Sequence, residues 1–248
     1  GPAFSIWFII FPLCVIYSVY QAFHANRDNK LLRRIGGFTL LAFVSTTIWS
    51  VLATTLDPPN NISYQSYEWI LMIILAVGIS APLINAIVCF NEIDETDKLP
   101  WKEKVCILGP ISLFGGWSTC AAFVNLSGAL LVSGVNSFKM NNDMTSSTVA
   151  YALIVAILVT FLIYLLRGNI AFSTACIWAY SWIAIKASEN HWEDISTVSI
   201  ICVLLFFSTA CVTQYSCHRN KVSRQDDRET HQILSSTTQP MTNNDSYH

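Results

Sequence analysis

The sequence has little charge. Only 12% of its 248 residues are Asp, Glu, Lys or Arg, whereas roughly a quarter of an ordinary soluble domain is charged. Hydrophobic residues make up 53% of the chain. They occur in runs of about 18 to 25 residues, the length that a helix needs to cross the hydrocarbon core of a bilayer. The shortage of charge argues against a soluble globular protein and indicates an integral membrane protein.

The sequence also lacks the motifs of several functional classes. The net charge is −2 and the basic residues form no long patch, which argues against nucleic-acid binding. None of the eight cysteines belongs to a Cys-x-x-Cys or Cys/His metal motif, and no His-Glu-x-x-His or Gly-x-Ser-x-Gly motif occurs. No ionisable residue falls in the middle of an apolar run, which weighs against proton-coupled pumps. We therefore expect neither an enzyme nor a metal protein.

Seven apolar runs predict seven membrane-spanning helices. A strand of a membrane barrel would alternate apolar and polar residues over about ten positions, so continuous apolar runs favour helices. The expected fold class is all-α, a polytopic transmembrane helical bundle in residues 1–215. The expected helices cover residues 4–23, 35–56, 67–90, 107–134, 148–166, 170–187 and 195–215.

Lysine and arginine gather on one side of this arrangement. Twelve of the fourteen lie in the first, third and fifth connections or after residue 215. The other side has only Lys139 and Lys186. Because cytoplasmic loops carry an excess of basic residues, we expect the start of the chain outside and its C-terminal tail in the cytoplasm. The tail, residues 216–248, is rich in Ser, Thr, Asn, Asp and Arg, a composition that predicts disorder.

The expected helix 107–134 carries a stripe of small residues. Ser112, Gly116 and Cys120 recur every four residues, and Gly128 is expected on the same face. Small residues at this spacing let another helix approach closely.

A second row on the same helix carries side chains that could contact a ligand. Trp117, Ala121 and Asn125 are also four residues apart, which places an indole and an amide on one face. Trp7 and Trp49 lie inside other apolar runs, where an indole N–H needs a hydrogen-bond partner. Asn125 likewise needs a polar partner, which is either another helix or a ligand.

These residues resemble the tryptophan-rich sensory protein family, which includes the translocator protein, and especially its longer multi-helix relatives. The resemblance covers most of residues 1–213. The matching residues are Pro2, Phe4 and Trp7 in the first run, then Trp117, Ala121 and Asn125, and finally Trp178-Ala179 with Ile183-Ala184-Ile185-Lys186.

The chain departs from the family pattern at two positions. The Tyr usually found four residues after the first Trp is Phe11 here, and the Asn usually found three residues before the next helix's Trp is Thr46. Both changes remove polar groups from the region where the family places its ligand cavity. Family members also have a helix before the Pro-Phe-Trp segment, so the resemblance implies a further span upstream of Gly1.

The resemblance implies that the bundle binds a hydrophobic ligand between aromatic side chains. The expected ligand is a porphyrin, a sterol or a lipid, and the expected site residues are Trp7, Trp49, Trp117 and Asn125. The expected partners are the lipid bilayer, this small molecule and a second copy of the chain in a homo-oligomer.

Two other functions fit parts of the pattern. Seven spans with an outer start and an inner tail also describe a G-protein-coupled receptor, although the third run ends in residues 91–94, Asn-Glu-Ile-Asp, rather than Asp-Arg-Tyr. A small-solute transporter is the other alternative, with Pro12, Pro82 and Asn85 marking broken helices around a midplane site.

Overall fold

A computed structural model of the chain describes residues 2–55, 64–133 and 146–237. All regular structure in these residues is helical, which confirms the all-α fold class. The α-helices are α1 (Trp7–Ala22), α2 (Lys30–Thr55), α3 (Tyr64–Ile73), α4 (Ala81–Asp97), α5 (Trp101–Glu103), α6 (Gly109–Val132), α7 (Ser146–Leu165), α8 (Ile170–Glu189) and α9 (Glu193–Thr237). Two 3-10 segments, η1 (Pro2–Ile6) and η2 (His24–Asn26), and two π-helical segments, η3 (Ile74–Ser80) and η4 (Lys104–Leu108), complete the order.

Six helical segments in the described ranges are long and apolar enough to cross a bilayer. They are Pro2–Ala22, Lys30–Thr54, Ser66–Asp94, Trp101–Leu130, Ile170–Glu189 and Glu193–Arg219. The seventh expected span corresponds to α7, which has 20 residues like α8 and contains the apolar stretch Tyr151–Leu165. All seven expected helices therefore have counterparts.

Two of these spans pass through prolines by widening a turn. The segment η3 ends two residues before Pro82, and η4 ends two residues before Pro110. Proline has no N–H and its ring crowds the carbonyl four residues earlier, and a π turn relieves both effects. Ser80 Oγ also donates to the Leu75 carbonyl at 2.8 Å. The helix from α3 to α4 is therefore continuous, and Pro82 does not mark a break.

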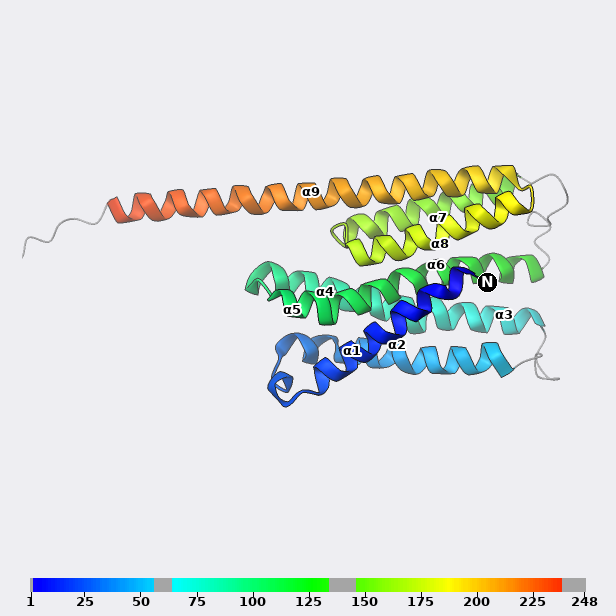
Figure 1. Cartoon of the computed structure of the whole chain (residues 1–248), viewed down its shortest axis with the longest axis horizontal. Coiled ribbons are helices and arrows are strands. Elements are labelled where there is room, and N and C mark those ends of the chain that lie inside the picture. Colours follow the sequence, from blue (N-terminus) through cyan, green and yellow to red (C-terminus); the bar gives the residue numbers. More distant parts are fainter. Residues whose placement is uncertain (1, 56–63, 134–145, 238–248) are drawn as a thin grey trace, which may run out of the picture.

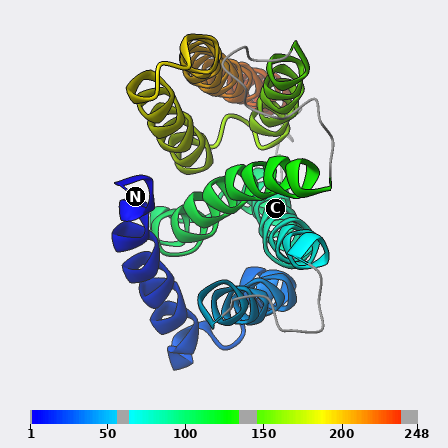
Figure 2. The same cartoon turned by 90° about the vertical axis from the view of Figure 1, so that its right-hand side faces the viewer.

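Helix α6 lies at the centre of the molecule. Figure 2, seen from one end of the molecule, shows α7, α8 and α9 grouped on one side of α6, and α1 and α2 on the other. Helix α6 contacts α1, α3, α4 and α8. Helix α1 crosses the others obliquely (Figure 1).

The basic connections come together at one end of the bundle. The α1–α2, α4–α5 and α7–α8 connections all lie at the left end in Figure 1, the end toward which α9 extends. Several of the charges there are paired: Arg34 with Glu92 at 2.6 Å, and Lys104 with Asp94 at 2.8 Å. Lys139, on the opposite side of the sequence-based topology, lies outside the described residues.

The last helix is longer than the sequence predicts. The expected helix ends at residue 215 and the expected disordered tail begins at residue 216, but α9 continues to Thr237. The prediction was wrong for residues 216–237 because loss of hydropathy marks the membrane boundary rather than the end of the helix. This segment contains no Gly or Pro, so no residue in it breaks the helix. The remaining residues, 238–248, lie outside the description.

The small residues of α6 bring α8 unusually close. A Cβ added at Gly116 would lie 2.4 Å from the Phe172 carbonyl oxygen and 3.0 Å from the Ala175 Cβ. One turn earlier, Asn169 Nδ2 donates to Ser112 Oγ at 2.9 Å. The stripe therefore packs against α8, as its spacing predicts.

The far end of the stripe faces another helix. The nearest group to a Cβ added at Gly128 is the Glu68 carboxylate on α3, at 3.9 Å. The expectation that Gly128 shares a face with Ser112 and Gly116 is therefore wrong. Each step of four residues turns a straight α-helix by about 40° beyond a full circle, and the four steps from Ser112 add up to about 160°.

Candidate ligand cavity

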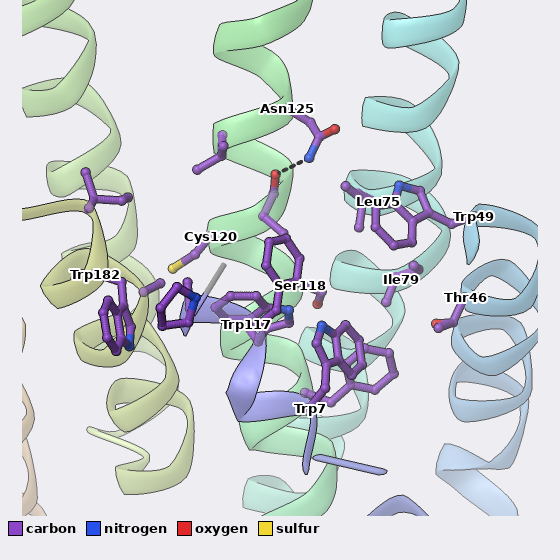
Figure 3. Close-up of a pocket in the computed structure, with 18 of the residues that line it drawn as sticks. Trp7, Thr46, Trp49, Leu75, Ile79, Trp117, Ser118, Cys120, Asn125 and Trp182 are labelled. Carbon is purple, nitrogen blue, oxygen red and sulfur yellow. Dashed lines mark hydrogen bonds between the residues drawn. The ribbon is translucent and has the colours of Figure 1, made fainter. Parts of the chain in front are cut away.

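The four predicted site residues lie around one cavity. Trp7, Trp49, Trp117 and Asn125, from α1, α2 and α6, all line a space of about 330 Å³ (Figure 3). Small-molecule pockets typically have volumes of about 300–1,000 Å³ and are lined mainly by apolar side chains. The cavity is thus at the lower end of the range for a small molecule.

Aromatic rings form one wall of the cavity. The Trp7 ring packs edge-on against Phe114 and Trp117, with centroids 5.6 and 6.4 Å apart. Phe4 meets Trp117 in a similar T-shaped contact at 5.8 Å. Phe11, which replaces the family's Tyr, stacks on Trp7 at 4.8 Å. Edge-to-face and offset-stacked pairs stabilise such clusters beyond the burial of their surface, so the wall is formed before any ligand arrives.

The indole of Trp49 has an unsatisfied hydrogen-bond donor. Its Nε1 atom is buried, and no acceptor among the described residues lies within hydrogen-bond distance. Two other indoles are satisfied: Trp69 Nε1 donates to Ser133 Oγ at 2.9 Å, and Trp178 Nε1 donates to the Ala3 carbonyl at 3.0 Å. A buried donor without a partner costs about 1–3 kcal/mol. The Trp49 N–H is therefore an unsatisfied donor on one of the side chains that line the cavity.

Asn125 and Thr46 contribute polar groups that are partly used within their own helices. The Asn125 amide nitrogen donates to the Ala121 carbonyl at 2.9 Å (Figure 3), which leaves its carbonyl oxygen as an acceptor. Thr46 Oγ1 donates to the Ala42 carbonyl at 2.7 Å. The bond to Ala121 satisfies one of the two Asn125 N–H groups within α6, and the second N–H and the carbonyl oxygen can still pair with another helix or a ligand.

A further wall of the cavity comes from α8. Ala179, Trp182, Ile183 and Lys186 all line it, at the 3- and 4-residue spacing that places side chains on one helix face. The sequence-based site lacks these residues. The available signal was Trp182, an indole inside an apolar run. The spacing of residues within α8 shows which side chains share a face, but it does not show that this face lies beside α6.

The segment η1, at the start of the described chain, lines the cavity between α6 and α8. Pro2, Ala3 and Phe4 of η1 line the cavity, and the hydrogen bond from Trp178 holds Ala3 against α8. The site is therefore assembled from segments more than 170 positions apart in the sequence.

The fold and the cavity together define a polytopic helical membrane protein with an aromatic-lined pocket. Comparison with known families identifies the group to which it belongs. The family model described as TSPO-like protein matches residues 1–212, and the chain is therefore a member of the TSPO-like family. No curated protein and no solved structure matches the chain.

Proposed function

We propose that this chain binds a hydrophobic small molecule, a porphyrin, a sterol or a lipid, in the cavity between α1, α2, α6 and α8. The observation that carries the proposal is the unpaired, buried Trp49 N–H in the wall of a pocket that is otherwise mainly apolar. An apolar body would fill the aromatic-lined space, and one acceptor atom would pair with the indole. This combination of apolar lining and few polar groups is typical of small-molecule sites.

The proposed orientation follows from the basic end of the bundle. The connections that carry Arg27, Lys98 and Arg167 lie at one end together with the extension of α9 (Figure 1). Basic residues favour the cytoplasmic side. We therefore place this end in the cytoplasm and the α8–α9 turn on the other side of the membrane.

Titration of the purified protein with protoporphyrin and with cholesterol tests the binding proposal. Tryptophan fluorescence reports binding because Trp7, Trp49, Trp117 and Trp182 surround the space. Saturable quenching by at least one ligand is expected. If neither produces it, the proposal is wrong.

A pair of tryptophan variants locates the site. Trp49→Phe should weaken binding of a ligand that bears an acceptor by about 2- to 10-fold, because one hydrogen bond contributes about 0.5–1.5 kcal/mol. It should cost less stability than a substitution that also breaks a hydrogen bond, since the N–H that it removes has no partner in the described structure. The matched control is Trp69→Phe, which breaks a hydrogen bond outside the cavity. The control should lower stability by about 1 kcal/mol and leave ligand affinity unchanged; the reverse pattern would contradict the assignment.

The transporter alternative receives no support from the two prolines. Helix α1 is continuous through Pro12, and the helix containing Pro82 is continuous as well. Asn85 is exposed, and its amide donates to the Ala81 carbonyl in its own helix at 2.8 Å. These residues do not form a midplane site.

A further inference from the structure

One end of the cavity carries a positive charge. Lys186 is the only charged residue among the described residues that line the cavity. It lies in the last turn of α8, seven positions after Ala179, which corresponds to about 10 Å along the helix axis. The α8 face therefore changes from apolar at Ala179, Trp182 and Ile183 to cationic at Lys186.

Lys186 can accept an anionic partner. Its ammonium group contacts the Glu189 carboxylate at 2.6 Å, but both side chains are more than half exposed. Exposed ion pairs of this kind are weak, and an ammonium group has three N–H donors. A second carboxylate can thus share Lys186 with Glu189, or replace Glu189, at a low cost in free energy.

The Trp49 donor and the Lys186 cation make the cavity amphipathic. Most of its lining is aromatic or aliphatic, so the apolar body of a ligand would contact mainly apolar side chains. A neutral ligand would leave Lys186 in its pair with Glu189, whereas an anionic ligand would gain a charge-assisted hydrogen bond.

We propose that the ligand is an amphiphilic carboxylic acid whose apolar body lies among Trp7, Trp49 and Trp117 and whose carboxylate faces Lys186. This inference rests on the proposed function and names the ligand class of the same cavity. A purely structural Lys186 would instead extend to the membrane interface and take no part in ligand choice.

A matched pair of probes tests the carboxylate. Retinol and retinoic acid share one polyene body and differ only at the terminal group, and both quench tryptophan by energy transfer. At mildly alkaline pH, the acid should bind about two- to fivefold more tightly than the alcohol, the range expected for an ion pair with a partly exposed lysine. Added salt should weaken only the acid, because Lys186 is partly exposed to solvent.

Three variants assign the effect to Lys186. Lys186→Gln should remove the preference for the acid and leave the affinity for the alcohol unchanged, and Lys186→Arg should retain the preference. The control Lys102→Gln removes an exposed cation from α5, at the other end of the bundle, and should change neither affinity. Equal binding of the two probes by the unaltered protein, or an equal loss of both in Lys186→Gln, would overturn the inference while leaving the hydrophobic cavity intact. If neither probe binds, nor protoporphyrin nor cholesterol, the cavity proposal fails and this inference fails with it.

Discussion

Replacing Gly116 by alanine is expected to destabilise the protein by separating α6 from α8. The new Cβ would lie 2.4 Å from the Phe172 carbonyl oxygen, about 1 Å closer than the usual distance between carbon and a carbonyl oxygen. The oxygen belongs to the backbone of α8 and cannot rotate away. Relief therefore requires the two helices to move apart by most of that distance.

The change in the free energy of unfolding combines two losses and one gain. Overpacking of a well-packed interface costs about 1–3 kcal/mol. Separation would also stretch the hydrogen bond between Asn169 and Ser112, now 2.9 Å long, and interhelical hydrogen bonds in membranes contribute about 0.6 kcal/mol on average. Against this, alanine is a better helix residue than glycine by about 0.5–1 kcal/mol. The net loss should be about 1–3 kcal/mol.

Gly37→Ala is the matched control for Gly116→Ala. Gly37 also lies within a helix, but a Cβ added there meets nothing within 4 Å, so only the helix-propensity gain applies. Thermal unfolding can be followed in detergent with a dye that fluoresces on reaction with thiols, because Cys120, Cys176 and Cys202 are at most 2% exposed in the folded protein. The midpoint should fall in Gly116→Ala and stay constant or rise in Gly37→Ala. Equal midpoints would refute the reasoning.

Two further predictions concern the start of α8 and the orientation of the chain. Asn169 caps α8 by accepting a hydrogen bond from the Phe172 N–H at 3.1 Å, so Asn169→Ala should cost about 1–2 kcal/mol in the same unfolding assay; Asn169→Ser keeps a capping oxygen and should cost less, and an equal loss in both variants would argue against the cap. Cys217 and a cysteine introduced by Asn190→Cys should react with an impermeant maleimide from opposite sides of the membrane, Cys217 from the cytoplasm, and the opposite result would reverse the proposed orientation.

Much of the fold could be predicted from single segments of sequence. Apolar runs predict helices because lipid offers no hydrogen bonds to the backbone, and this holds for every expected span. The close approach at Gly116 was also predictable, because small residues every four positions remain on one face over two turns. Over four turns the same rule fails, and Gly128 therefore faces α3.

The residues of the cavity could not be predicted from the spacing of residues within single helices. Trp7, Trp49, Trp117 and Asn125 were named from a family resemblance, and the structure brings them to one space. The contribution of α8 was missed because Lys186, near the end of its apolar run, was considered only as one of the two basic residues on the outer side and as part of the family pattern. Its place in the wall follows from the packing of α8 on α6, which only the three-dimensional arrangement specifies.

The π segment η3 has a consequence for the shape of the cavity. Two of its residues, Leu75 and Ile79, line the wall. A π turn holds more residues than an α turn, so the segment rotates everything after Ser80 relative to the residues before Ile74. If the same residues formed an ordinary α-helix, the face of α4 would turn by about 100° relative to α3. Val88, now exposed on the outside of the bundle, would then point in a new direction, so the π turn determines which side chains of α4 the bundle shows to lipid.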